Sequence, residues 1–356
     1  IVLEEFRVEY VKDRVQAVGT GLLGLTLHCA QCHDHKYDDI PTKGYYQTFA
    51  MFNNIDETGQ ISWDAKDMPV PTMLLPTDRQ QTEIQSTHQK IIDSEAKVAN
   101  VVNNSDASFS AWKKQRAAVD LLASDALVAH YPFNEKDNTK KIASAIDKTK
   151  SGRVLFSSSK NEKTGDDLVN KLDENNQSFL LNGDDALFFP DENNFNRATP
   201  FTVSLKSKLS NELKEAALFH FNLSSTLYTY KGFDVSIEES HWLVRLAHNY
   251  PYNAITLRSK EPVTKDQWQH VTMTYDGSSK ASGVNFYLDG ELVSMTVERD
   301  NLYKDIRHPG DDNLGLVTGL KVGARWRDRG AANSLVDDLK VWSRDLSQIE
   351  VKANAE

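Results

Sequence analysis

The stretch that decides the fold is Val284-Asn285-Phe286-Tyr287-Leu288-Asp289-Gly290-Glu291-Leu292-Val293-Ser294-Met295-Thr296-Val297. Apolar and polar side chains alternate on both sides of Asp289-Gly290, which is the pattern of half-buried strands. An Asp-Gly pair between two such runs is a strong signal for a two-residue β-hairpin. The sequence therefore predicts two antiparallel strands, over Val284–Leu288 and Leu292–Val297.

Short runs of the same kind continue in both directions from this hairpin, beginning near Asp125 and separated by turn signals such as Asn182-Gly183 and Asp276-Gly277. Many short strands at regular spacing are typical of a sandwich or jelly roll. The other predicted strands are Ala126–Tyr131, Ala186–Phe189, Phe201–Leu205, Ala217–Phe221, Trp242–Ala247, His270–Tyr275, Leu320–Val322 and Ser334–Trp342. We therefore expect an antiparallel β-sandwich over residues 124–349.

The chain before Asp125 has the apolar spacing of helices. Between Glu4 and His28, valines and leucines recur every three to four residues, which predicts one helix. Thr77-Asp78-Arg79-Gln80 has the pattern of a capping box, which marks a helix start. Apolar residues seven apart follow it and predict a long exposed helix, with a second helix over Ala107–Leu122.

These elements predict an α+β, multidomain chain. A helical unit occupies residues 1–76, a helical hairpin residues 77–123 and the sandwich residues 124–349. The length of 356 residues suits two domains of ordinary size. The formal net charge of −10 argues against a nucleic-acid partner, because phosphate binding needs a basic surface. No apolar stretch approaches the ~20 residues of a membrane span.

Both cysteines of the chain lie in Cys29-Ala30-Gln31-Cys32-His33, the C-x-x-C-H signature of covalent haem attachment. Two thiols at this spacing can each bond one vinyl group of haem c, and the adjacent histidine can bind its iron. Two alternatives remain open at this point: a redox disulfide, or a metal site completed by neighbouring imidazoles such as His35. Covalent haem attachment takes place outside the cytoplasm, so it would require export of the chain.

Three runs within the N-terminal 60 residues, and the aromatic residues after them, carry a resemblance to a known family. The runs are Asp13-Arg14-Val15-Gln16-Ala17-Val18, Leu22-Leu23-Gly24-Leu25-Thr26 and Cys29-Ala30-Gln31-Cys32-His33-Asp34-His35-Lys36-Tyr37-Asp38. In these runs the chain resembles the cytochrome-type modular proteins of planctomycetes and related bacteria, which are large and exported. The resemblance implies a periplasmic or extracellular location, a redox partner protein and further parts of a parent chain beyond this one. It also favours a role for His35.

The second half resembles a laminin-G-like or concanavalin A-like module. Its matching residues include Trp268-Gln269-His270-Val271, Asn285-Phe286-Tyr287-Leu288-Asp289-Gly290 and Val336-Asp337-Asp338-Leu339-Lys340-Val341-Trp342. The resemblance implies a jelly roll that binds carbohydrate or protein ligands, sometimes with calcium, or that serves only as structure.

Several side chains are candidates for binding a metal ion or a sugar. Acidic turn and strand residues suit calcium, and aromatic rings with guanidinium groups suit sugar stacking and hydroxyl recognition. Trp268 and Trp342 lie inside strand patterns and are expected in the core. The predicted metal ligands are His33, His35, Asp184 and Asp337, and the predicted ligand-binding residues are Trp242, Tyr250, Tyr252, Trp326 and Arg327.

These residues support two functional hypotheses. The first is an exported c-type-cytochrome-like electron-transfer segment coupled to a sandwich that binds polysaccharide or protein. The second is a non-redox extracytoplasmic scaffold whose C-x-x-C-H stretch holds a structural metal or a disulfide. No paired-carboxylate motif, phosphate loop or zinc-protease motif indicates a hydrolase.

Overall fold

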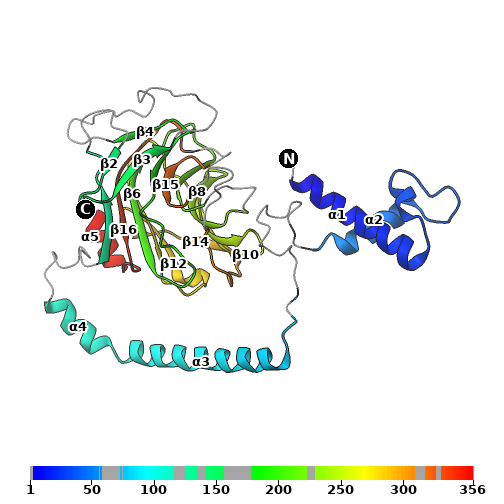
Figure 1. The fold of residues 1–356 in the computed structure, drawn as a ribbon, viewed down its shortest axis with the longest axis horizontal. Coiled ribbons are helices and arrows are strands. Elements are labelled where there is room, and N and C mark those ends of the chain that lie inside the picture. Colours follow the sequence, from blue (N-terminus) through cyan, green and yellow to red (C-terminus); the bar gives the residue numbers. More distant parts are fainter. Residues whose placement is uncertain are drawn as a thin grey trace.

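The computed structural model describes residues 3–55, 57, 73, 75–115, 126–134, 141–155, 178–222, 229–308, 317–325 and 330–355. It contains helices followed by a two-layered antiparallel sandwich (Figure 1), so the α+β, multidomain prediction is confirmed. The predicted residues 116–122 of the second helix, and Trp326 and Arg327, lie outside the described part.

The helical unit begins with α1 (Leu3–Val18) and ends with α2 (Thr42–Phe52). Between them lie a π-helical turn over Gly19–Leu23 and a 3₁₀ turn over Leu27–Gln31. The predicted single helix therefore stops short of His28: its α-helical part ends at Val18, and the π-helical turn that follows ends at Leu23, where Gly24 has a positive φ of 65°. A small core of Val15, Leu27, Ala30 and Tyr45 holds these pieces together.

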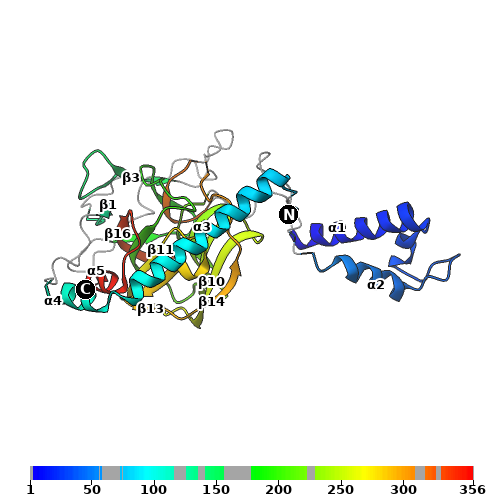
Figure 2. The same cartoon turned by 90° about the horizontal axis from the view of Figure 1, so that it is seen from below.

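The long exposed helix is confirmed as α3 (Asp78–Asn103), which has no buried residue. Its capping box is formed as predicted: Gln80 N donates to the Thr77 hydroxyl, and Thr77 N donates to Gln80 Oε1. The predicted hairpin is wrong, however. Figures 1 and 2 show α4 (Asp106–Gln115) continuing beyond α3 rather than folding back along it.

The first layer of the sandwich is a seven-stranded sheet of order β1-β16-β6-β11-β12-β13, with β4 also paired to β16. Its strands are β1 (Leu127–Tyr131), β4 (Phe179–Leu181), β6 (Phe201–Lys208), β11 (Trp268–Tyr275), β12 (Val284–Leu288), β13 (Glu291–Leu292) and β16 (Ser334–Trp342). The short helix α5 (Gln348–Ala355) lies on the outer face of this sheet, where Val351 packs against Tyr287 and Trp342.

The second layer is a nine-stranded sheet of order β14-β10-β9-β8-β7-β15-β5-β3-β2. Its strands are β2 (Lys141–Ala143), β3 (Ser151–Leu155), β5 (Ala186–Phe189), β7 (Ala216–His220), β8 (Gly232–Glu238), β9 (His241–Asn249), β10 (Asn253–Pro262), β14 (Met295–Asp300) and β15 (Leu320–Gly323).

The hairpin at Asp289-Gly290 forms as predicted. Both turn residues have positive φ, 50° and 78°, and Tyr287 pairs with Leu292 across the turn. The second strand differs from the prediction, because it divides after Leu292. Its continuation, β14, joins the other sheet beside β10, so the chain changes layer at Val293-Ser294.

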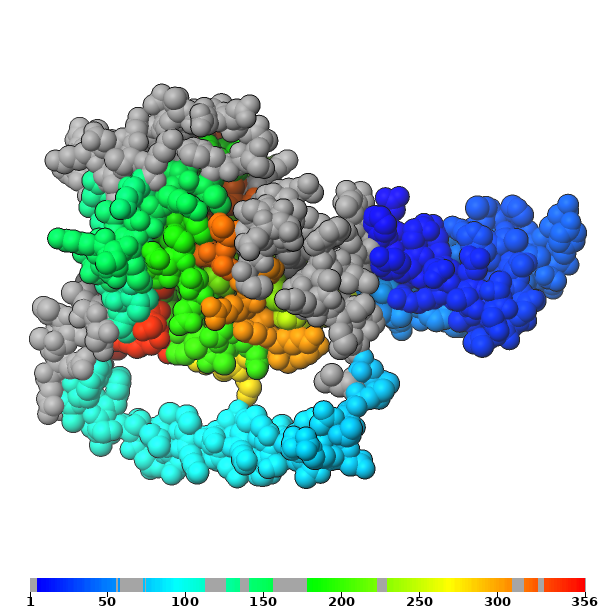
Figure 3. All heavy atoms as spheres, in the orientation of Figure 1, coloured from blue at the N-terminus to red at the C-terminus, as the bar shows by residue number. Residues whose placement is uncertain are grey.

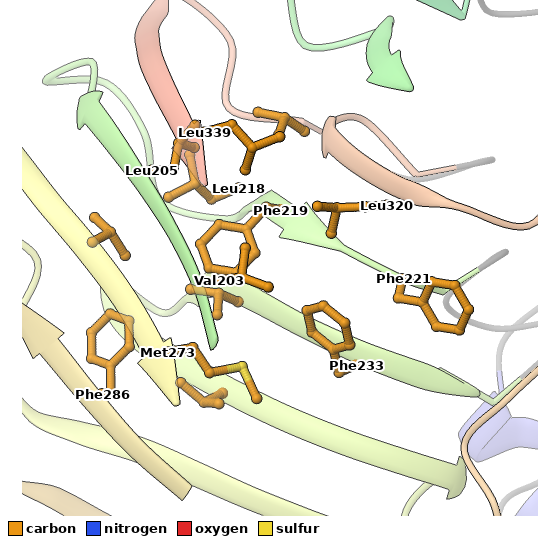
Figure 4. Close-up of a cluster of buried hydrophobic side chains, with 14 of the residues drawn as sticks. Val203, Leu205, Leu218, Phe219, Phe221, Phe233, Met273, Phe286, Leu320 and Leu339 are labelled. Carbon is orange, nitrogen blue, oxygen red and sulfur yellow. The ribbon is translucent and has the colours of Figure 1, made fainter. Parts of the chain in front are cut away.

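The main core fills the space between the two sheets. Figure 4 shows Val203 and Met273 from the first sheet facing Leu218 and Phe233 from the second. Fully burying side chains of this size stabilises the fold by roughly 1.5–3 kcal/mol each. The outer faces of both sheets are therefore left for polar residues, and these include the candidate sites.

Candidate functional site

The C-x-x-C-H motif lies on the 3₁₀ turn between α1 and α2. Cys29 and Cys32 are both free and exposed, while Ala30 between them is buried in the small core. The buried alanine anchors the turn and leaves the two thiols facing outward. The motif therefore has the accessibility that covalent attachment of a large group requires.

His33 is oriented by its own loop. Its Nδ1 lies 2.7 Å from the backbone oxygen of Asp34 and donates to it, so the neutral ring carries its lone pair on Nε2. Within the described residues, Nε2 has no hydrogen-bond partner. A backbone carbonyl that fixes the tautomer in this way is the usual second-shell arrangement of a metal-binding histidine.

His35 has a structural role instead. Its Nδ1 accepts a hydrogen bond of 2.9 Å from Asp38 N, and its Nε2 lies 2.9 Å from the Thr26 hydroxyl. Both ring nitrogens are therefore occupied, and only 5% of the side chain is exposed. In this conformation, therefore, neither ring nitrogen of His35 is available to bind a metal, which contradicts the prediction.

The predicted calcium ligands do not come together. Asp184 is exposed in a turn after β4, where its N–H donates to Asn182 Oδ1. Asp337 lies in β16 next to Val336, which pairs with Phe179 at the opposite end of β4. Over the residues that the structure places, no group of three or more His, Cys, Asp or Glu side chains could hold a metal ion. The pairing of Asp184 with Asp337 in one site is therefore wrong.

The predicted sugar-binding aromatic residues do not lie together either. Trp242 is 1% exposed and packs against Phe286 in the core, so it cannot serve as a surface platform. Tyr250 lies beside Tyr230, and both rings contact the Arg245 guanidinium on the nine-stranded sheet. The Tyr252 carbonyl accepts from Asn301 in the loop that follows β14.

A cavity of about 310 Å³ lies on the outer face of the seven-stranded sheet and is lined by Ser178, Lys206, Trp268, Gln269, His270, Asp289, Asp337 and Ala355. Its floor is one row of the sheet. Lys206 in β6 is the register partner of Asp337 in β16 on one side and of His270 in β11 on the other. Register partners point to the same face, so these three side chains face the cavity together.

Each of the three has an unused polar group. His270 is 3% exposed, its Nδ1 lies 3.2 Å from the Thr272 hydroxyl, and its buried Nε2 has no partner. Asp337 Oδ1 accepts from Asp338 N at 2.9 Å, but Oδ2 has no partner within the described ranges. The Lys206 ammonium likewise has no described partner. Buried polar groups are normally satisfied, so the buried His270 Nε2, with the Lys206 ammonium and Asp337 Oδ2 beside it, makes this cavity a candidate ligand site.

Burial changes the ionisation of this row. Desolvation raises the pKa of Asp337 to about 6, and the neighbouring Asp338 acts in the same direction. Desolvation lowers the pKa of His270 to about 4, helped by Lys340 and Lys206. At neutral pH the imidazole is therefore neutral, and the cavity offers an ammonium, a carboxylate and an uncharged ring nitrogen.

Trp268 stands at the rim of this cavity. It was predicted in the core, but its side chain is 38% exposed, because it is the first residue of β11 and extends beyond the covered part of the sheet. Trp342, also predicted in the core, is 1% exposed, which confirms that prediction. The sequence pattern alone could not distinguish these two tryptophans.

A second charged cluster lies on the outer face of the nine-stranded sheet. Asp234 is fully buried and accepts from Arg245 Nε at 3.0 Å and Nη2 at 3.1 Å, and Arg325 Nη1 lies 3.2 Å away. These arginines hold the pKa of Asp234 far below its usual range against the effect of burial. Because its charges are paired, the cluster stabilises the sheet rather than offering a free group.

The architecture is that of a concanavalin A-like β-sandwich preceded by a small helical unit. Comparison with known families agrees with both parts. Residues 181–352 match the laminin G model of the concanavalin A-like lectin/glucanases superfamily, and residues 1–57 match PSCyt2, a protein of unknown function (DUF1549). No curated protein matches the chain.

The solved structures to which this chain is similar include three domains of low sequence identity. Domain 4 of the extracellular arabinanase AbnA from Geobacillus stearothermophilus, solved with arabinotriose, is 16% identical with a TM-score of 0.42, and the match covers 65% of this chain and 98% of that one. The binding domain of Paraclostridial Mosquitocidal Protein 1 is 13% identical with a TM-score of 0.45, over 66% and 52%. The botulinum neurotoxin serotype D ligand-binding domain, solved with N-acetylneuraminic acid, is 16% identical with a TM-score of 0.42, over 66% and 52%. The match therefore spans about half of each toxin chain.

No helix of the described residues is long and apolar enough to cross a membrane.

Proposed function

We propose that the β-sandwich binds carbohydrate in the cavity bounded by Trp268, Lys206, His270 and Asp337. The observation that carries the proposal is a buried His270 Nε2 without a partner in the described residues, next to Lys206, Asp337 and a half-exposed indole at one cavity. An indole face stacks on the C–H face of a sugar, while ammonium, carboxylate and imidazole groups exchange hydrogen bonds with its hydroxyls. A volume of about 310 Å³ lies at the lower end of the range for small-ligand pockets.

The test is a glycan array followed by calorimetric titration of the full chain with the sugars that bind. Trp268→Ala should weaken binding about fivefold, since stacking on an aromatic ring contributes about 1 kcal/mol. Tyr303→Ala is the matched control, because Tyr303 is a similarly exposed aromatic, 45% exposed, outside the cavity. Absence of any glycan affinity, or equal loss in both variants, would leave the sandwich as a scaffold.

We further propose that the N-terminal unit carries haem c, bound through Cys29 and Cys32, with His33 as the iron ligand. Two observations support this proposal: the thiols are exposed, and the His33 tautomer presents an unpartnered Nε2. The unit also exposes large apolar side chains, including Leu22 at 80% and Met51 at 70%, which a bound macrocycle could cover. Haem would supply one-electron transfer, and the chain would then act outside the cytoplasm with a redox partner protein.

Covalent haem is tested by expressing the chain in an export-competent host with cytochrome c maturation proteins. The denatured protein should retain a reduced haem spectrum, and Cys29→Ser with Cys32→Ser should abolish it. His33→Ala should keep the attachment but change the spectrum, whereas His88→Ala on α3 should change nothing. A colourless wild-type protein would favour the non-redox alternative, in which the motif holds a structural metal or a disulfide.

A further inference from the structure

A second row of side chains crosses the outer face of the nine-stranded sheet. Pairwise register joins β3, β5, β15, β7, β8, β9, β10 and β14 through Arg153, Phe188, Lys321, His220, Asp234, Arg245, Thr256 and Arg299, in that order. Four of these eight residues are arginine or lysine, and one is acidic. The chain as a whole has a formal net charge of −10, so this basic row is a local exception.

The positive charge of the row is neutralised in the middle and not at one end. Arg245 is paired with Asp234 and Glu238, and Arg258 beside it is paired with Glu298. By contrast, Arg153 and Lys321 contact no carboxylate in the described part of the chain. Lys321 Nζ donates to the Val317 carbonyl at 3.0 Å, and this oxygen carries no net charge.

The two unpaired cations flank a single aromatic ring. The Arg153 guanidinium lies 5.4 Å and the Lys321 ammonium 5.3 Å from the centre of Phe188, which is the register partner of both residues. Two strand spacings separate their Cα atoms by roughly 10 Å. Arg153 is exposed, whereas Lys321 is 6% exposed, so one cation faces solvent and the other lies deeper on the same face.

A buried ammonium without a counter-charge is costly, and such groups are normally paired. Desolvation alone lowers the pKa of Lys321 to about 8, which agrees with the absence of a carboxylate beside it among the residues that the structure describes. An oxyanion beside Lys321 would provide the missing charge, and Arg153 would reach it from the solvent side with a two-pronged donor.

We propose that Arg153 and Lys321 form an anion-binding site for a carboxylate or sulfate group carried by an acidic polysaccharide. The site lies on the sheet opposite the Trp268 cavity and does not depend on that cavity. It would attach the sandwich to polyanionic chains despite the overall negative charge of the protein, because close pairing at one site outweighs screened repulsion at a distance.

The experiment is calorimetric titration of the full chain with polygalacturonate, dextran sulfate, uncharged dextran and inorganic sulfate. The wild-type protein should bind one or both charged polymers, should ignore dextran, and should bind inorganic sulfate at least tenfold more weakly than the polymer. Lys321→Met and Arg153→Met should each weaken polymer binding at least tenfold. Lys260→Met, which removes an exposed cation from the same sheet, should change it less than twofold.

Thermal unfolding distinguishes loss of the site from loss of the fold. Lys321→Met should unfold at the same temperature as the wild type or higher, because it removes an unpaired buried charge. The proposal is overturned if neither polymer binds, if inorganic sulfate binds as tightly as the polymer, or if Lys321→Met retains full affinity. Loss of neutral-sugar binding in Trp268→Ala, with polyanion binding unchanged, would show that the two sites are separate.

Discussion

Burial raises the pKa of Asp337 and lowers the pKa of His270. The native protein holds a proton on Asp337 up to a pKa of about 6, so this residue favours folding below pH 4 and loses that contribution as pH rises to 6. His270 has a native pKa of about 4, so its contribution is complete above pH 6.5 and is lost as pH falls through 4. In the wild type the two effects nearly cancel.

Substitution should reveal each effect separately. Without Asp337, only the effect of His270 remains. Between pH 4 and pH 6.5 the free energy of unfolding of Asp337→Asn should therefore rise by about 3 kcal/mol more than that of the wild type, since each pKa unit corresponds to about 1.4 kcal/mol. The free energy of unfolding of His270→Gln should fall by a similar amount over the same pH range. Urea unfolding followed by tryptophan fluorescence at the two pH values measures both. Parallel pH profiles for all three proteins would show that neither group is desolvated in the folded state.

This site could not be found from sequence alone. Asp337 was predicted as a calcium ligand by its acidic character, but Lys206 and His270 were not considered, because nothing in the sequence states that three distant strands are neighbours. Cross-strand register creates the site, and register depends on the complete sheet. The spacing of Trp268 and His270, two residues apart in one strand, is the one sequence signal that could have placed them on the same face.

At the scale of elements, the strand predictions succeeded where local signals were strong. The Asp289-Gly290 turn and β16 were predicted closely, because a defined turn and strict alternation fix them. The first helix was overextended and the division at Val293-Ser294 was missed, since both depend on where neighbouring elements lie. A hairpin was expected after Asn103 because a break between helices was taken for a reversal of direction.

Helix α3 provides a test of the difference between local and tertiary stability. Its apolar residues are exposed, with Ile84 at 53%, Ile91 at 49% and Val98 at 63%. Figure 3 shows open space between α3 and the sandwich, and the exposed Glu95–Lys280 ion pair bridges it. Ion pairs that are fully exposed to solvent contribute little to stability. The helix therefore depends mainly on its own capping box and side-chain propensities.

We expect the triple substitution Ile84→Ala, Ile91→Ala and Val98→Ala to change the free energy of unfolding of the sandwich by less than about 0.5 kcal/mol, as for exposed sites in general. Helicity should be preserved, because alanine has the highest helix propensity. Leu205→Ala is the matched control: it removes a fully buried side chain and should cost about 2–5 kcal/mol. Chemical unfolding and circular dichroism measure both. Destabilisation by the triple variant comparable to Leu205→Ala would mean that α3 packs on the sandwich in solution.

For the whole molecule, the buried clusters divide the chain into two parts. The cluster of the helical unit contains no residue beyond Phe52, and the clusters of the sandwich contain none before Ala126. Cooperative unfolding requires a shared core, so the two parts should unfold in separate transitions. The smaller unit should be the less stable, because four buried residues provide little apolar burial.

Calorimetry of the full chain should therefore show two transitions, and residues 126–356 expressed alone should reproduce the upper one within about 2 °C, a shift that corresponds to less than about 1 kcal/mol in a domain of this size. Compared with wild-type protein that carries haem, Cys29→Ser with Cys32→Ser should shift only the lower transition. Glycan affinity should be the same in the isolated sandwich and in the full chain, because the cavity is lined by sandwich strands and α5. A single transition, or an isolated sandwich that unfolds at a much lower temperature than in the full chain, would instead require an interface between the two parts. Haem attachment would then be expected to alter glycan binding by the sandwich.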